Sequence, residues 1–227
     1  LDARILTPMG WKTMDEIHVG DRLVNPEGGT ATVLKVFPQG VQSVFSVTFS
    51  DRSSAECTMD HLWNVTTALR RWRGSKSRLL TLREIVNEGI SRRYGGRKVR
   101  YHFIPLTDPV KFENSVPLLL SPYVMGALLG DGGMNGTVVV FTSADQDIVQ
   151  GISDELPVNA EIALKRGSKY DHSIRSVPRN SPNPVVAALR HYGLMGHRAE
   201  GKFIPEVYLR STISNRIALL QGLFDTD

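Results

Sequence analysis

The sequence predicts an α+β protein with a β-rich first part and a mixed second part, and three observations support this. Residues 1–65 hold short runs rich in Val, Thr and Phe, separated by turn formers such as Asn-Pro-Glu-Gly-Gly and Pro-Gln-Gly. This pattern is typical of compact all-β units. From Ser121 onward, helix-like and strand-like runs alternate. An apolar, glycine-containing run near residue 124 returns near residue 220, which indicates an internal repeat.

The composition is that of an ordinary soluble globular protein. Of the 227 residues, 41% are hydrophobic and 22% are charged. The longest apolar runs are far shorter than the roughly 20 residues that span a bilayer, and no signal-peptide pattern opens the chain. We therefore expect a cytoplasmic protein with no membrane partner. Cys57 is the only cysteine, which excludes an intramolecular disulfide, and we expect it to pack as a small buried apolar residue.

In the first part, the runs GDRLVN, ATVLKVF and VFSVTFS are predicted strands, and RKVRYHFIPL is a further one. Thr81-Leu-Arg-Glu84 fits a capping box, so a helix is expected from there to about Glu88, with Gly89 ending it. The predicted boundaries are a β-rich domain over 1–69, a basic insertion or linker over 70–108, and a mixed domain over 109–227.

In the mixed domain the sequence predicts four helices, a strand and a hairpin. Capping patterns, apolar periodicity and terminal glycines locate them. The expected elements are a helix over Ser121–Gly132, a strand over Thr137–Thr142, a helix opened by a capping box at Ser143 and running to about Glu155, a hairpin of EIALKR and HSIRSV around Gly167-Ser168, a helix over Asn183–Tyr192 closed by Gly193, and a last helix from about Val207 to the end.

Positive charge is concentrated between residues 70 and 100. Eleven Lys or Arg face two acids there, a net charge of +9 that leaves −5 for the rest of the chain. With Trp72 and Tyr94 interleaved, such a block suits a phosphate backbone, although a solvated surface loop is the plain alternative. The cations are Arg70, Arg71, Arg73, Lys76, Arg78, Arg83, Arg92, Arg93, Arg97, Lys98 and Arg100.

The two similar runs are VMGALLGDG, which begins at Val124, and LQGLFDTD, which begins at Leu220. Each has glycine at the third place and aspartate at the eighth. Glycines on one helix face let two helices approach closely, which would bring Asp131 and Asp227 together. Neighbouring carboxylates repel unless a proton or cation lies between them, and Mg²⁺ suits such oxygen ligands. Two buried helices in which each Asp merely caps its helix are the structural alternative.

These paired runs resemble the two motifs of a LAGLIDADG homing endonuclease. The resemblance implies an αββαββα repeat, a double-stranded DNA target, and Mg²⁺ held by Asp131 and Asp227. Lys202, in Gly-Lys-Phe-Ile-Pro-Glu, matches the K-x-x-P block, whose lysine lies near the cleavage site; an ordinary exposed lysine is the alternative. The DNA-contacting residues would be Arg70, Arg71, Arg73, Lys76, Arg78, Arg92, Arg93 and Arg97 in the basic block, and Lys165, Arg166, Lys169 and Arg175 in the hairpin. The hairpin, which also carries His172, would present alternate positions to DNA, in a register that the sequence leaves open.

Residues 1–65 resemble the first two sequence blocks of an intein, a protein-splicing element with an all-β Hint-type fold. The second block contains T-x-x-H, here Thr58-Met-Asp-His61. An acyl shift must protonate a leaving nitrogen, which a histidine can do as a general acid, while a threonine hydroxyl orients the amide. Splicing needs no cofactor. A histidine satisfied in a core or turn is the alternative for His61.

The start of the chain departs from the common intein pattern. It reads Leu1-Asp2, where ordinary inteins begin with Cys or Ser. Either the nucleophile lies one residue upstream, or the chain belongs to a less common class (class 3) that has Trp two positions after the block histidine and an attacking Cys elsewhere. Trp63 occupies that position. Cys57 is a poor substitute nucleophile. It neighbours Thr58 on a presumed strand, and successive strand residues point to opposite faces.

The resemblance as a whole implies an autocatalytic splicing element that carries a Mg²⁺-dependent, site-specific DNA endonuclease. It covers residues 1–65 and about 110–227, and the expected missing portion is a C-terminal part with the remaining endonuclease repeat and splicing blocks. The implied partners are that part, the flanking host protein (the exteins) and double-stranded DNA. The alternatives are an intein with an inactive endonuclease remnant, or a non-catalytic DNA-binding regulatory protein.

Overall fold

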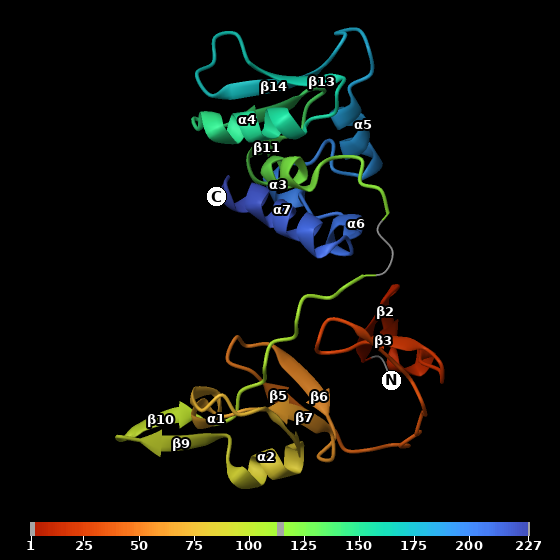
Figure 1. Ribbon diagram of the computed structural model, residues 1–227, viewed down its shortest axis with the longest axis vertical. Coiled ribbons are helices and arrows are strands. Elements are labelled where there is room, and N and C mark those ends of the chain that lie inside the picture. The colour runs from red at the N-terminus through yellow and green to blue at the C-terminus, as the bar shows by residue number, and fades with distance from the viewer. Residues whose placement is uncertain (1–2, 113–115, 227) are drawn as a thin grey trace. The chain divides into compact units, whose positions relative to one another are not determined.

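The computed structural model describes residues 3–112 and 116–226. The chain divides into two compact units, Leu1–Thr7 with Trp11–Asp108, and Pro8–Gly10 with Pro109–Asp227 (Figure 1). Strands and helices occur in both, so the predicted α+β class is confirmed. Within the described ranges, no helix is both long enough and apolar enough to cross a bilayer.

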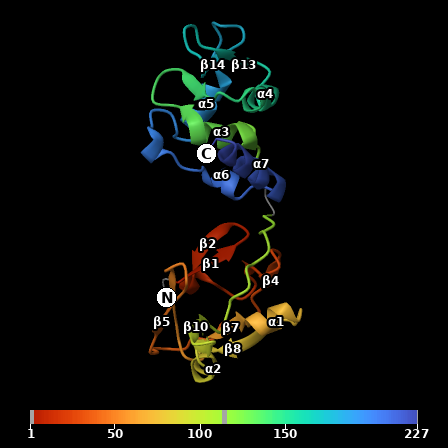
Figure 2. The same cartoon turned by 90° about the vertical axis from the view of Figure 1, so that its left-hand side faces the viewer.

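The first unit consists of short antiparallel strand pairs and short helices. Its largest buried apolar cluster is small and contains Val65, Leu80 and Ile85, with Trp63 packed against it. The pair of β7 (Leu62–Val65) and β8 (Arg78–Thr81) supplies Val65, Leu80 and Trp63, and α2 (Leu82–Glu88), which lies beside this pair, supplies Ile85 (Figure 2). The pairs are β1 (Arg4–Thr7) with β2 (Gly10–Thr13), β3 (Arg22–Val24) with β4 (Thr30–Thr32), β5 (Phe45–Thr48) with β6 (Ser54–Cys57), β7 (Leu62–Val65) with β8 (Arg78–Thr81), and β9 (Ser91–Tyr94) with β10 (Arg97–Arg100), and the helices are η1 (Met14–Glu16), α1 (Ala68–Trp72) and α2 (Leu82–Glu88).

The predicted capping box forms at the start of α2. The Glu84 backbone N–H donates to Thr81 Oγ1 at 3.2 Å, and the Thr81 N–H donates to the Glu84 carboxylate at 2.7 Å. Gly89 ends the helix with φ +89°, a left-handed value that glycine adopts without a Cβ clash. The helix therefore begins and ends where the sequence placed it.

The predicted strand ATVLKVF is wrong for most of its length. Only its first two residues belong to β4, and the backbone ladder ends at Val33. Leu34 and Phe37 are 81% and 69% exposed. A strand requires a neighbouring strand for its backbone hydrogen bonds, and apolar composition alone does not supply that neighbour. RKVRYHFIPL is likewise strand only over β10, with a further isolated bridge between Phe103 and Thr66.

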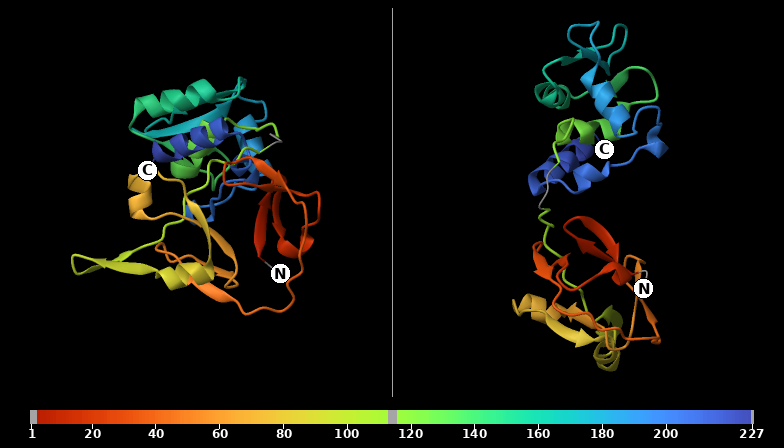
Figure 3. Two further views of the ribbon diagram at one scale, coloured as in Figure 1. Left: turned by 60° about the horizontal axis from the view of Figure 1, so that its bottom comes forward. Right: turned by 90° about the vertical axis from the view of Figure 1, so that its right-hand side faces the viewer.

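The second unit holds most of the buried apolar residues, packed between one antiparallel sheet and its helices (Figures 1 and 3). The sheet order is β11-β12-β14-β13. In chain order the elements are α3 (Pro122–Asp131), β11 (Gly132–Gly133), β12 (Val139–Thr142), α4 (Gln146–Glu155), β13 (Ala160–Leu164), β14 (Asp171–Ser176), α5 (Pro184–His191), η2 (Ala199–Gly201), α6 (Glu206–Leu209) and α7 (Ile213–Phe224).

Two helix predictions in this unit need correction. The cap of α4 is Asp145 rather than Ser143, because the Asp145 carboxylate accepts the Asp147 N–H at 2.9 Å. The last predicted helix is two helices, α6 and α7, separated by Arg210–Thr212. Thr212 caps α7 by accepting the Asn215 N–H at 3.2 Å; a side chain that satisfies a free amide in this way starts a new helix.

The strand register decides which hairpin residues can meet a ligand. Phe141 pairs with His172 and Val139 pairs with Ile174, and all four side chains are buried on the face that carries the core. His172 is therefore one of the alternate hairpin positions that face the core. Arg175 follows Ile174 and projects from the opposite face, because side chains alternate along a strand.

Candidate functional sites

Helices α3 and α7 pack together through the predicted glycines. A Cβ at Gly126 would overlap the carbonyl oxygen of Leu219 and lie 3.0 Å from the Leu223 nitrogen, and one at Gly222 would lie 2.8 Å from the Ala127 nitrogen. The 2.8 Å value is shorter than real Cβ contacts, and the 3.0 Å value is tighter than nearly all of them. Backbone therefore meets backbone here, and the close approach expected from the repeated motif is confirmed.

The C-terminal ends of the two helices also meet. Thr226 occupies the place in the second motif that Gly130 occupies in the first, and its side chain packs directly over Gly130. Thr226 Oγ1 lies 3.0 Å from the carbonyl oxygens of Gly222 and Leu223, to which it donates. Asp131 is exposed at the end of α3. Asp227 lies outside the described residues, so its proximity to Asp131 stays a prediction.

The side chain of Tyr123 contacts both α7 and α4 from its place on α3. Tyr123 of α3 donates its hydroxyl to Asp225 at the end of α7, with an O–O distance of 3.0 Å. Its ring also packs on Gly151 of α4. Burial, and then the hydrogen bond to the Asp225 carboxylate, raise the pKa of Tyr123 to about 12. The phenol therefore stays neutral and donating at physiological pH.

Lys202 caps the C-terminal end of α3. Its Nζ donates to three backbone carbonyls, those of Leu128 at 3.2 Å, Leu129 at 3.0 Å and Gly130 at 2.9 Å. These carbonyls belong to the last turn of α3, at the negative end of the helix dipole, and that of Leu128 also accepts the Gly132 N–H. Burial lowers the pKa of Lys202, and the negative charge of Asp131 partly opposes that shift. Lys202 is thus a fixed ammonium beside Asp131.

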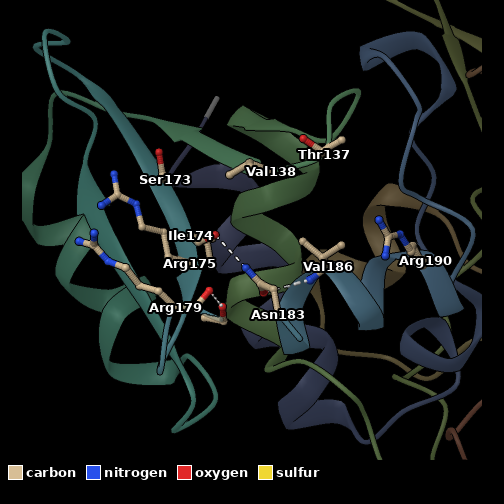
Figure 4. A pocket seen from close by; sticks show the side chains of 10 residues that line it. Thr137, Val138, Ser173, Ile174, Arg175, Arg179, Asn183, Val186 and Arg190 are labelled. Carbon is tan, nitrogen blue, oxygen red and sulfur yellow. Dashed lines mark hydrogen bonds between the residues drawn. The ribbon is translucent and has the colours of Figure 1, made fainter. Parts of the chain in front are cut away.

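The other basic residues of the second unit that are predicted to contact DNA lie at the β13–β14 turn and on β14. Lys165, Arg166 and Lys169 are exposed at the turn, and the Lys169 Nζ lies 5.1 Å from the centre of the Tyr170 ring. Arg175 also borders an open hollow of about 560 Å³ between β14 and α5. Figure 4 shows Arg175 and Arg179 extending away from α5, whereas Asn183 hydrogen-bonds the Ile174 carbonyl at 2.9 Å. The arginines do not converge on one point in this hollow.

In the first unit, Thr58 and His61 form the ends of one tight turn. The His61 N–H donates to the Thr58 carbonyl at 3.2 Å. The turn is fixed against the start of α2, since the N–H groups of Leu82 and Arg83 donate to the carbonyls of His61 and Met59 at 3.0 and 2.9 Å. The His61 side chain is exposed and the Thr58 side chain is half-buried. The two predicted residues are therefore neighbours on a rigid turn.

Trp63 supports His61 from the side. Their rings make an edge contact with centroids 5.4 Å apart, and Phe49 packs on Trp63 at 5.9 Å. The indole Nε1 is buried without a hydrogen-bond partner among the described residues. Phe49 was not singled out from the sequence, because one Phe in a strand-like run carries no distinguishing signal. Cys57 is buried, 8% exposed, as expected.

The eleven cations of the basic block fall into two groups. Five already have intramolecular partners, and the prediction that cations of this block contact DNA stays a prediction. The engaged cations are Arg70 on the Lys76 carbonyl, Arg71 over the Phe103 ring, Arg78 with Glu88, Arg83 with Asp60 and Arg92 over the Tyr101 ring. In the described ranges the other six, Arg73, Lys76, Arg93, Arg97, Lys98 and Arg100, show no side-chain partner.

A buried histidine lies at the base of this block and was not predicted. The His102 side chain is 8% exposed, and its Nε2 is 3.6 Å from Glu88, which also binds Arg78. Burial lowers the pKa of His102; Glu88 opposes this shift, and Arg78 and Arg92 reinforce it. Glu88 is thus shared, and it is not free to neutralise nearby surface cations.

Comparisons with known proteins give one whole-chain relative. The chain aligns over its full length with the replicative DNA helicase DnaB of Mycobacterium intracellulare, at 26% identity over 246 positions, and covers 37% of that protein. The chain therefore spans well under half the length of this curated relative. A solved structure titled as the Msm DnaB1 intein splicing domain bound with zinc matches at 24% identity and a TM-score of 0.28, over 48% of this chain and 86% of that one. No family model matches.

Proposed function

We propose that this chain is part of an intein, an autocatalytic protein-splicing element, and that its second unit belongs to a LAGLIDADG homing endonuclease. The observation that supports this most is the glycine-to-backbone packing of α3 and α7, two copies of one motif. The sequential order of helix, two strands, helix, two strands and helix from α3 to α5 fits the αββαββα repeat of that family.

For splicing, His61 is the proposed general acid and base. Its exposed ring lies on a turn held by α2, where it can protonate the leaving nitrogen of a peptide bond bound there. Thr58, at the other end of that turn, would orient the same amide with its hydroxyl. Trp63 would fix the ring by its edge contact. The first nucleophile is supplied either by a residue upstream of Leu1 or by a downstream Cys.

For DNA cleavage, the proposed metal ligands are Asp131 and Asp227, with Lys202 beside them. Asp131 offers an exposed carboxylate with no ion-pair partner among the described residues, which fits Mg²⁺, an ion that keeps several waters and takes few carboxylates. When bound, the ion would stabilise attacking and leaving phosphodiester oxygens. Lys202 would add positive charge at a position fixed by three carbonyls.

The DnaB alignment is compatible with this proposal. A splicing element is translated within its host polypeptide, so it would align with one portion of a host such as a helicase, here 37% of it. The flanking host protein, the C-terminal part that completes the element and a double-stranded DNA target are the proposed partners.

The splicing proposal is tested in the complete polypeptide placed between two reporter proteins. Ligated reporters, or cleavage at a junction, are expected by mass spectrometry. His61→Ala should abolish the reaction that depends on the upstream junction, whereas His18→Ala, at an exposed histidine of the same unit, should not. Unchanged splicing in His61→Ala would remove the assignment.

The endonuclease proposal is tested with the complete protein, Mg²⁺ and the host gene lacking the element. Asp131→Asn should abolish cutting, and Asp147→Asn, an exposed acid on α4, should leave it intact. If wild type binds the gene without cutting, the second unit is an inactive remnant. If it neither splices nor cuts but binds DNA, the non-catalytic regulatory alternative is correct.

The alignment also favours a second candidate, namely that the chain is a segment of a helicase proper. A helicase motor requires a phosphate-binding loop, G-x-x-x-x-G-K-[ST]. The nearest match runs from Gly196 to Lys202, but Phe203 follows where Ser or Thr is required. The ammonium group of Lys202 already donates to backbone carbonyls of α3. ATP–Mg²⁺ binding in calorimetry, lost in Lys202→Met, would favour this candidate over splicing.

A further inference from the structure

The β9–β10 pair is a basic ribbon with two different faces. It projects from the rest of the first unit (Figure 1, and Figure 3, left). Gly95 and Gly96, with φ +55° and +80°, close it in a two-residue turn that requires left-handed backbone at both positions. Arg93 lies directly opposite Lys98. Like charges placed opposite each other destabilise a strand pair, so folding alone does not favour this arrangement.

One ribbon face carries free charge. Arg93, Lys98 and Arg100 share it, because Arg93 pairs with Lys98 and Ser91 pairs with Arg100. All three cations are exposed, and they have no side-chain partner in the described part of the chain. We call Arg93, Lys98 and Arg100 the free face.

The opposite face is engaged within the protein at Arg92, whereas Arg97 on it is exposed and has no side-chain partner among the described residues. It carries Arg92, Tyr94, Arg97 and Val99. The Arg92 guanidinium lies 3.6 Å from the centre of the Tyr101 ring, and Tyr101 contacts His102 edge-on. This face is therefore anchored at the ribbon's base.

Neither acid of the basic block compensates the free face. The block contains two acids, and both are engaged. Glu84 accepts the N–H and the hydroxyl of Thr81, and Glu88 is shared by Arg78 and His102. The positive potential of the ribbon is thus left for an external anion.

We propose that the free face binds the phosphates that border the major groove of duplex DNA, with the ribbon lying in the groove. The major groove of B-DNA admits a two-stranded β-ribbon, whereas the major groove of A-form RNA is deep and narrow. The inference rests on the proposed function only in taking DNA as the partner. It narrows the contact set of this ribbon to Arg93, Lys98 and Arg100.

The test is a salt titration of the full chain with a mixed-sequence DNA duplex in EDTA, followed by fluorescence anisotropy. Each phosphate contact contributes about 0.9 to the slope of log K against log salt. Arg93→Gln/Lys98→Gln/Arg100→Gln should therefore lower that slope by about 2.7. Between 50 and 200 mM salt, wild type should lose about 40-fold more affinity than this triple variant.

Matched variants separate position from total charge. Lys98→Gln should lower the slope by about 0.9, while Arg92→Gln and Arg97→Gln, each removing one charge from the other face, should change it by much less. Equal losses from Arg97→Gln and Lys98→Gln would overturn the face assignment. Equal loss in the triple variant with an RNA duplex would overturn the groove assignment.

The result also separates this inference from the proposed function. Wild-type binding with an unchanged slope in the triple variant overturns the ribbon inference and leaves DNA as partner of the second unit. No binding by wild type at any salt concentration overturns both. Tryptophan fluorescence of each variant checks folding of the first unit, which contains Trp11, Trp63 and Trp72, all the tryptophans of the chain.

Discussion

The ammonium group of Lys202 lies 2.9 Å from the carbonyl oxygen of Gly130, the residue directly before Asp131. This contact joins positions 72 residues apart in the chain. It neutralises the negative end of α3 and fixes a cation beside the proposed metal ligand. The same lysine thus stabilises the helix that carries the motif and supplies positive charge to the proposed site.

Lys202→Met should destabilise the second unit by about 1–3 kcal/mol, because three carbonyls at the end of α3 lose a charged donor. The measurement is urea unfolding followed by circular dichroism at 222 nm. Lys165→Met, which removes an exposed turn lysine, should change stability by less than about 0.5 kcal/mol. Equal effects from the two substitutions would show that Lys202 is an ordinary surface lysine.

Gly126→Ala and Gly222→Ala should each destabilise the protein by more than about 2 kcal/mol, since the new methyl group meets backbone that cannot move aside. Gly151→Ala is the matched helical control. Its Cβ would meet only the Tyr123 ring, at 3.2 Å, and alanine favours helix over glycine by about 1 kcal/mol. We expect it to be neutral or stabilising. Similar losses at all three glycines would contradict the paired-helix packing.

The Tyr123–Asp225 hydrogen bond should be worth about 1 kcal/mol in a double-mutant cycle of Tyr123→Phe and Asp225→Asn. The phenol has its pKa raised to about 12, so it stabilises the fold fully below about pH 10, and this contribution disappears as the pH rises toward 12. A coupling energy near zero at pH 7 would mean that the contact does not hold α7 to α3.

Stability of the first unit should fall as the medium becomes acidic, in a way that depends on His102. Its pKa is depressed from the ordinary 6.5, so its contribution is fully present above about pH 6.5 and is lost as the pH falls through the lowered value. His102→Gln should flatten the dependence of unfolding free energy on pH between about 4 and 7, followed by tryptophan fluorescence. His18→Gln, at an exposed site, should leave the dependence unchanged.

Local signals in the sequence located most helices correctly. The α2 capping box and the glycine after α2 form as predicted, and the helix expected from Asn183 is α5, with Asn183 as its cap, because each depends on groups within a few residues. The strand-level gaps share one cause. ATVLKVF lacks a strand partner beyond Val33, and the side of the hairpin that faces outward stayed open until His172 was paired with Phe141; both depend on distant segments.

The sequence by itself determined that two copies of a glycine-bearing motif exist, where charge accumulates, and which residue types carry the chemistry, since composition and spacing are local properties. The tertiary structure alone decided that Gly126 meets the Leu219 backbone, that Lys202 binds carbonyls of α3, and that some cations of the basic block are engaged while Lys98 is free. Those outcomes depend on which distant groups satisfy one another's hydrogen bonds and charges, and a linear sequence does not state that pairing.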